Sequence, residues 1–243
     1  GTVWTSELIS SIVHEGDLVT LKARRMLDRV PWLECIPDDP LFRKSDSLNT
    51  GKKNLWFTHL SLERLPTDIR EGKCKLVYVA RNPKDQAVSN FHFHKLNDSL
   101  GQQADLTWSE FFSLNCSGNI YFGSWFDHVL SFWKFTRNNP NTKFIFFEDM
   151  KKDLISQVKE IEEFVGVPLT DEQRSRVVQH CSFSSMRENK MVNGTTAFDE
   201  KIGKFMRKGE IGDWKNHFTV AQNEAFDELF ETKMEGSGIK FTF

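Results

Sequence analysis

Short apolar runs alternate with amphipathic segments along this chain, and the alternation predicts its fold class. Two runs are rich in residues that suit buried strands, Lys75–Ala80 and Lys143–Phe147. Around them, apolar residues recur every three or four positions, as in helices with one buried face. Because strands that alternate with helices form parallel sheets, we predict an α/β fold with a mainly parallel central sheet flanked by helices.

The same periodicity predicts the positions of the helices. They are Thr5–Glu15, a helix opened by the capping-box pattern Thr107-Trp108-Ser109-Glu110, Phe122–Thr136, Leu154–Val165, Thr170–Cys181 and Val220–Met234. Leu18–Lys53 is expected to form loops with short helices, and Ser182–Gly212 lacks clean periodicity. Leu55–Thr58 is expected to be another short buried strand. No repeat or linker divides the chain, so we predict a single domain over residues 1–243.

Composition and charge narrow the possible functions. Charged residues make up 27% of the chain and the net charge is −2, which is not typical of a protein that binds nucleic acid or a membrane surface. The four cysteines form no CxxC pair, so we expect neither a zinc site nor disulfides, and a reducing, cytoplasmic location. The sequence contains no apolar run long enough to span a bilayer.

Candidate chemistry is concentrated in Lys75–Phe93, where a predicted strand ends at Arg81. The residues Asn82-Pro83-Lys84-Asp85 are typical of a turn, and helical spacing follows, so Arg81 is expected at the carboxyl edge of the sheet, where ligands bind. Ser89 lies one helical turn beyond Asp85, and a guanidinium with a hydroxyl suits phosphate or sulfate. On spacing alone, an Arg paired with a local carboxylate and a Ser on a polar helix face is the commoner arrangement.

Three other segments also allow a functional and a structural interpretation. Gly1-Thr2-Val3 enters the first helix, whose free N–H groups can bind an anion, although an ordinary helix start has the same pattern. His59 follows the predicted strand Leu55–Thr58, and a lone histidine there is more often structural than catalytic. Phe205-Met206-Arg207-Lys208-Gly209 suits either a second phosphate clamp or, more commonly, a solvated basic loop.

Taken together, these segments resemble the cytosolic sulfotransferases over nearly the whole chain. The matching segments are Gly1-Thr2-Val3-Trp4, Thr58-His59-Leu60, Arg81 to Ser89, Cys181-Ser182-Phe183, Arg207-Lys208-Gly209, and Lys215 with Thr219-Val220 and Glu224. Each is weak alone, but their joint order and spacing identify the family. The resemblance implies a P-loop-like phosphosulfate-binding loop and transfer of a sulfuryl group from 3′-phosphoadenosine 5′-phosphosulfate (PAPS) to a small phenol, alcohol, steroid or amine, with PAP as the product.

The resemblance also implies roles for individual residues. The 5′-phosphosulfate would be held by a loop that ends with Gly1, Thr2, Val3 and Trp4. The adenine would lie between the rings of Trp4 and Phe183. At the 3′-phosphate the residues are Arg81, Ser89, Arg207, Lys208 and Gly209. Further donor-site residues are Phe147, Cys181, Met186, Phe205 and Met206. His59 would be the general base, an effect typically worth about 10²–10⁴ in rate, with Phe57 and Thr58 beside it at the acceptor. Lys215, Thr219, Val220 and Glu224 would form a homodimer contact, and no metal is implied.

The chain departs from the family pattern in three places. The family's loop lysine and the strand before it would precede Gly1, so we expect the sequence to lack that strand and the start of the loop. Phe57 replaces a lysine, which weakens stabilisation of the transferring group. Phe147 replaces a tyrosine near the adenine, which removes a hydrogen bond worth roughly 0.5–1.5 kcal/mol. A nucleotide-binding pseudoenzyme of the same fold is therefore the alternative; a P-loop kinase is disfavoured because the Mg²⁺-linked Walker pattern is missing.

Overall fold

The computed structural model describes residues 1–35, 53–96, 105–194 and 204–243. Contacts divide the chain into two compact units: unit 1 comprises Gly1–Leu60 and Asp149–Ala197, and unit 2 comprises Ser61–Glu148 and Phe198–Phe243. Among the described helices, none combines the length and the apolar character that crossing a membrane requires.

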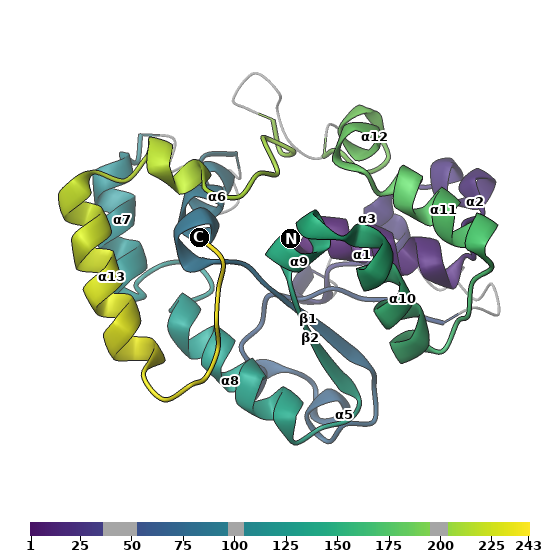
Figure 1. Cartoon of the computed structure of the whole chain (residues 1–243), viewed down its shortest axis with the longest axis horizontal. Coiled ribbons are helices and arrows are strands. Elements are labelled where there is room, and N and C mark those ends of the chain that lie inside the picture. The colour runs from purple at the N-terminus through teal and green to yellow at the C-terminus, as the bar shows by residue number, and fades with distance from the viewer. Residues whose placement is uncertain (36–52, 97–104, 195–203) are drawn as a thin grey trace. The chain divides into compact units, whose positions relative to one another are not determined.

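Unit 2 contains the parallel strands β1 (Leu76–Ala80) and β2 (Thr142–Phe146), which lie side by side in Figure 1. The chain passes from one strand to the other through α6 (Pro83–Leu96), α7 (Trp108–Ser117) and α8 (Trp125–Arg137), the helical crossover that parallel pairing requires. The register places Ala80 opposite Phe146, so both strands end at the same edge. The predicted α/β fold with a parallel sheet and flanking helices is therefore confirmed.

Helices pack around these strands through an aromatic core. η3 (Leu62–Arg64) and α5 (Thr67–Arg70) precede β1, while η5 (Asp213–Asn216) and α13 (Val220–Met234) follow later in the chain. α8 packs against β2, and α13 packs against α8. The buried core residues here are Phe126, Val129, Phe226, Met234 and Ile239, surrounded by partly buried rings that include Tyr78, Phe112, Trp125, Trp133, Phe144, Phe146, Phe218, Phe230 and Phe241. Much of the chain's large aromatic content thus serves packing.

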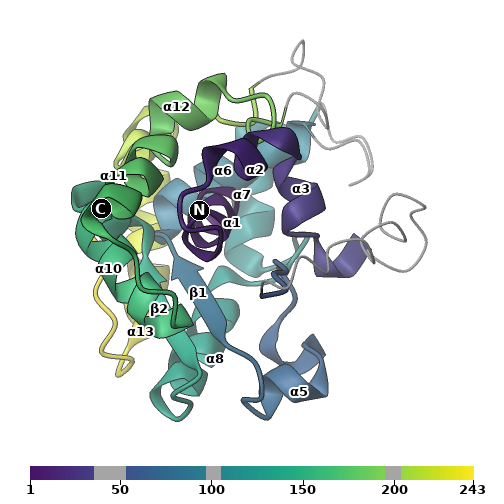
Figure 2. The same ribbon diagram turned by 90° about the vertical axis from the view of Figure 1, so that its right-hand side faces the viewer.

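Unit 1 is helical and centres on α1 (Thr2–Val13). In chain order it also contains α2 (Leu18–Ala23), α3 (Met26–Arg29), η1 (Leu33–Cys35), α10 (Leu154–Val165), α11 (Asp171–His180) and α12 (Phe183–Glu188), while α9 (Phe147–Lys152) enters it from unit 2. α1 contacts α2, α3, α10 and α11, and Figure 2 views α1 close to its axis. Leu8, Ile12 and Val13 are buried on it, as the apolar spacing predicts.

A charged cluster lies at the centre of unit 1. Glu7 on α1 is fully buried, forms an ion pair with Arg29 of α3 at 2.5 Å and contacts Nε2 of His180 on α11 at 2.7 Å. Arg29 also donates a hydrogen bond to the Ser10 hydroxyl. Buried charges are costly unless they are paired. The ion pairs of this cluster therefore favour one arrangement of α1, α3 and α11.

Several sequence predictions of structure were wrong in detail. Leu55–Thr58 is no strand: Phe57 forms a single parallel bridge with Trp32, and Trp56 is 49% exposed. β1 is only partly buried except at Ala80. α8 begins at Trp125 rather than Phe122, because Phe122 has a φ of 77° and Ser124 caps the helix. α12 lies in the segment that lacked periodicity, and residues 36–52 of the predicted loop region lie outside the described part of the chain.

Candidate active site

The carboxyl ends of β1 and β2 bring two predicted site residues together. Arg81 follows β1, Phe147 follows β2, and the Arg81 guanidinium lies 4.4 Å from the centroid of the Phe147 ring. Only 13% of the Arg81 side chain is exposed. Burial lowers the pKa of Arg81, nearby Asp85 opposes the shift, and the guanidinium stays charged. The sheet therefore presents a cation at its carboxyl edge, supported by an aromatic face.

Asn82 opens a helix at this point, so the prediction of a turn over Asn82–Asp85 was wrong. The Asn82 side-chain oxygen accepts a hydrogen bond from the Asp85 N–H at 2.8 Å, and Pro83 occupies the first helical position, where its missing N–H costs nothing. The Asn82 backbone and side-chain N–H groups donate to Glu148 at 2.9 and 3.1 Å. Burial raises the pKa of Glu148. Asn82 thus joins the ends of the two strands.

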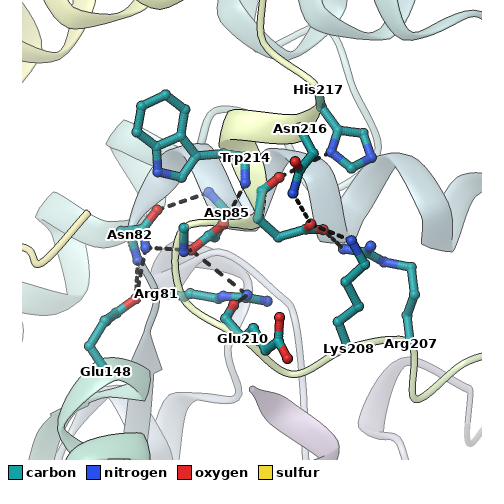
Figure 3. A network of polar contacts seen from close by, with 12 residues as sticks. Arg81, Asn82, Asp85, Glu148, Arg207, Lys208, Glu210, Trp214, Asn216 and His217 are labelled. Atoms are coloured by element: carbon teal, nitrogen blue, oxygen red, sulfur yellow. Dashed lines mark hydrogen bonds and ion pairs between the residues drawn. The ribbon is translucent and has the colours of Figure 1, made fainter.

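Asp85 connects the start of α6 to a segment more than a hundred residues later. Its carboxylate is buried and accepts hydrogen bonds from the backbone N–H groups of Gly212 at 2.7 Å and Trp214 at 3.0 Å. It also accepts one from the Asn82 side chain at 2.9 Å and lies 3.9 Å from Arg81. Figure 3 shows Asp85 at the centre of these contacts. No motif or spacing in the sequence predicts these contacts of Asp85.

Arg207 and Lys208 precede the segment Gly212–Trp214, in which the backbone N–H groups of Gly212 and Trp214 donate to Asp85. Each forms an ion pair with Asp213 at 2.5 Å, and Figure 3 shows the Arg207 and Lys208 side chains next to each other. Burial acts to raise the pKa of Asp213, but hydrogen bonds from Lys208, Asn216 and Arg207 hold it well below its usual value. Arg81 donates to the Glu210 carbonyl at 2.7 Å, so the two predicted phosphate-binding segments share one polar network in unit 2.

Four further predicted residues lie in unit 2: Phe205, Met206, Gly209 and Ser89. The Phe205 ring meets Phe93 edge-on at 6.4 Å, Met206 is partly buried, and Gly209 has a φ of 64° that favours glycine. Ser89 is exposed on α6 and is not among the residues that form the network.

Unit 1 brings together the residues implied at the adenine and the 5′ end of the donor. Gly1 caps α1, and Thr2, Val3 and Trp4 form its first turn, where helix N–H groups lack intrahelical partners. The Trp4 indole N–H donates to the Cys181 carbonyl at 2.8 Å, and Phe183 begins α12 two residues later. Cys181 and Met186 are fully buried. Burial raises the pKa of the Cys181 thiol, so this cysteine is a packing residue.

His59 lies in an aromatic setting in unit 1. Its ring meets Trp32 at 5.4 Å and Phe57 at 5.7 Å, both edge-on, while Trp32 and Phe57 stack on each other at 5.7 Å. The His59 backbone N–H donates to Glu34 at 2.6 Å, and the neighbouring Thr58 hydroxyl accepts from the Leu60 N–H. Phe57, which stands where the resemblance implies a lysine, therefore packs directly against the predicted base. The sequence did not predict the contact between Glu34 and His59. That contact depends on the bridge between Trp32 and Phe57, which brings the two segments together.

The four residues of the predicted dimer contact lie on the surface of unit 2. Lys215, Thr219, Val220 and Glu224 are exposed, and Thr219 caps α13. Val220 is an apolar side chain that is 76% exposed. Within the described residues, no group of three or more His, Cys, Asp or Glu side chains has the geometry to hold a metal ion.

Comparison with known proteins identifies the family. A model of the sulfotransferase domain matches residues 1–238. Human sulfotransferase 1C2 is 38% identical over 247 aligned positions, which cover 99% of this chain and 82% of that protein. Bovine sulfotransferase 1E1 is also 38% identical, over 99% of this chain and 82% of its own length.

Solved structures agree with these relatives. A crystal structure of retinol dehydratase with retinol and PAP has a TM-score of 0.86 at 25% identity and covers 100% of this chain and 80% of that one. Mouse sulfotransferase SULT7A1 complexed with PAP has a TM-score of 0.72 at 34% identity, covering 98% and 82%. The chain therefore belongs to the sulfotransferase-domain family, and it is an enzyme of the sulfotransferase class. The predicted family, fold and activity are confirmed, and the pseudoenzyme alternative is not favoured.

Proposed function

We propose that this sulfotransferase takes PAPS as its donor and that Arg81, Arg207 and Lys208 bind the 3′-phosphate. The polar network of unit 2 carries the proposal. Three cations gather there, and the carboxylates of Asp85, Asp213 and Glu148 lie close to them. Arg207 and Lys208 are partly exposed and each has further N–H donors, so both can contact a phosphate while keeping Asp213 as a partner. PAP in the related structures supports the same donor.

In unit 1 we assign residues to the 5′ end and the adenine of the donor. The first turn of α1 offers N–H groups for the 5′-phosphosulfate, and such donors stabilise the charge that develops on the departing phosphate. Trp4 and Phe183 stack on the adenine. The hydrogen bond from Trp4 to Cys181, two residues before Phe183, supports this pairing because it fixes the indole beside the start of α12.

His59 is the general base that takes the proton from the acceptor's hydroxyl or amine. A neutral imidazole is suited to this step, which typically contributes about 10²–10⁴ in rate. The acceptor is a small molecule, and retinol and androsterone in the two retinol dehydratase structures show that related proteins hold apolar ligands of this size. The aromatic contacts of His59 with Trp32 and Phe57 suit such a ligand.

Calorimetry with two nucleotides tests the donor assignment. Arg81→Ala is expected to weaken PAP far more than adenosine 5′-phosphate, which lacks the 3′-phosphate. Arg137→Ala, which removes an exposed arginine in the last turn of α8, is the matched control and should leave both affinities unchanged. Equal losses for both nucleotides in Arg81→Ala would refute the 3′-phosphate assignment.

Transfer of radiolabelled sulfate from PAPS to a panel of phenols, alcohols, steroids and amines tests the chemistry. His59→Ala should bind PAP normally and lose transfer. Activity that survives this change would exclude His59 as the base. Donor binding without transfer to any acceptor would favour the pseudoenzyme.

We also propose a homodimer whose contact includes Lys215, Thr219, Val220 and Glu224, all of which are exposed. Sedimentation of Val220→Glu should show monomers. Val19→Glu, at an equally exposed valine in unit 1, is the control and should remain dimeric. We also propose a cytoplasmic location, which cell fractionation would test.

A further inference from the structure

Asp85 is the most deeply buried carboxylate of the unit 2 network, and its own contacts leave no face for a ligand. Its side chain has no exposed surface. Its oxygens accept from Gly212, Trp214 and the Asn82 side chain at 2.7 to 3.0 Å. We infer that Asp85 is a positioning residue: it fixes the segment Gly212–Trp214 and, through Asp213, the two cations that meet the donor's 3′-phosphate.

Asp85 holds the backbone on both sides of Asp213. Asp85 accepts from the N–H groups on both sides of Asp213, those of Gly212 and Trp214. Two hydrogen bonds to the flanking amides restrict the backbone position of the residue between them. Asp213 therefore takes its position from a side chain on α6.

Asp213 in turn binds two of the cations. Its side chain is 3% exposed and meets Lys208 and Arg207 at 2.5 Å each. A buried carboxylate below two partly exposed cations holds their charged ends in place and leaves their outer donors available. Without a fixed Asp213, these flexible side chains would have to be ordered by the ligand, at a cost to affinity.

Arg81 is tied to the same groups. It donates to the Glu210 carbonyl at 2.7 Å and lies 3.9 Å from Asp85, so it contacts the same segment and the same carboxylate. Figure 3 shows Arg81 on one side of Asp85 and Trp214 on the other. Asp85 thereby fixes the spacing between Arg81 and the Arg207–Lys208 pair.

A carboxylate is required at position 85 because every group around it donates. Asparagine has the same shape but carries one N–H₂ group in place of an oxygen, and this group would face another donor at Gly212, Trp214 or Asn82. The Asp85→Asn change therefore releases part of the segment while adding no bulk. This inference rests on the proposed role of Arg81, Arg207 and Lys208 at the 3′-phosphate.

The test compares nucleotide affinities by calorimetry in Asp85→Asn. PAP should bind about tenfold more weakly, the factor that corresponds to about 1.4 kcal/mol, while adenosine 5′-phosphate should change by less than about twofold. With PAPS and an acceptor, the KM for PAPS should rise and kcat at saturating PAPS should be retained. A general loss of structure would instead affect both nucleotides and kcat.

Glu162→Gln is the matched control. It makes the same chemical change at a buried carboxylate of unit 1, where Glu162 pairs with Arg174 at 2.6 Å. It should leave the preference for PAP unchanged. If Asp85→Asn does not fold, Gly212→Ala disturbs the same segment with all charges kept, because Gly212 has a φ of 86° that alanine rarely adopts, and it should show the same selective loss.

The outcomes separate this inference from the proposed function. If the wild-type protein binds PAP no more tightly than adenosine 5′-phosphate, the proposed 3′-phosphate site is wrong and the inference falls with it. If the wild type prefers PAP, Arg81→Ala removes the preference and Asp85→Asn keeps it, only the positioning role of Asp85 is refuted.

Discussion

The buried cluster of Glu7, Arg29 and His180 allows a quantitative prediction about unit 1. Arg29→Met removes the charged partner of a carboxylate that has no exposed surface and leaves the Ser10 hydroxyl without its donor. Breaking a buried pair by removing one partner typically costs about 3–5 kcal/mol, because an uncompensated charge remains. Methionine refills much of the volume with apolar atoms. We therefore expect the free energy of unfolding to fall by about 3 kcal/mol, the lower end of that range.

Urea denaturation followed by tryptophan fluorescence measures this loss. The slope of the free energy of unfolding against urea concentration should be similar in both proteins, as expected if their folded states are equally compact. Arg25→Met is the matched control, since Arg25 adjoins the same helix and pairs with Asp28 at 2.8 Å, but its side chain is 35% exposed. Exposed pairs contribute about 0–1 kcal/mol, so the control should lose less than about 1 kcal/mol.

A double variant separates charge burial from shape. Glu7→Met with Arg29→Met removes both charges, and replacing a buried pair with apolar residues is often neutral or stabilising. It should therefore be more stable than Arg29→Met alone. Equal losses in Arg25→Met and Arg29→Met, or additive losses in the double variant, would refute the argument that the loss of the Arg29 charge beside buried Glu7 dominates. Because Trp4 lies one turn before Glu7 on α1, Arg29→Met should also weaken nucleotide binding.

Two further predictions concern chemistry and pH. Phe57→Lys restores the cation that the family pattern places near His59, so kcat in the sulfate-transfer assay should rise while the affinity for PAP stays constant; an unchanged or lower kcat would show that the ring is needed there. Burial, and then Arg207 and His217, lower the pKa of His92 from 6.5 to about 4. Between these values the unfolded state binds more protons, so the free energy of unfolding should fall as the pH drops from 6.5 to 4. The full effect would be about 3 kcal/mol, and solvent screening of this partly exposed ring reduces it to ~1 kcal/mol. His92→Gln should flatten this part of the pH–stability curve, and an unchanged slope would contradict the assignment.

The sequence predicted most helices because their signals are local. The capping box at Thr107 is formed with Glu110, and Gly166 ends α10 in a left-handed conformation, both as expected from residue type. The Asn82 segment was misinterpreted because Asn-Pro is common both in turns and at helix starts. Asp85 three residues later was the available signal for a helix cap. Leu55–Thr58 failed for another reason: an apolar run becomes a strand only where a partner pairs with it along its length.

Sequence motifs predicted the site residues, but they did not predict Asp85 and Glu148, which hold those residues in place. Arg81 and Arg207 belong to segments that the family pattern marks. Asp85 contacts residues 127 and 129 positions later in the chain, and no periodicity or spacing signals such a pairing. Glu148 similarly meets Asn82 across the ends of the two strands. Such contacts depend on the sheet register, which fixes which side chains share an edge.

The two aromatic replacements in the site differ in their physical consequences. Phe147 keeps the ring face that a tyrosine would offer, and the Arg81 guanidinium lies on that face at 4.4 Å. A cation–π contact is worth about 0.5–2 kcal/mol and does not need the hydroxyl, so the 3′-phosphate half of the donor site can retain its arginine. Phe57 instead replaces a charge with an apolar ring packed on His59. A ring cannot neutralise a transferring sulfuryl group, so its effect belongs to the chemical step. A deficiency of this enzyme should therefore appear in kcat before it appears in the affinity for the donor.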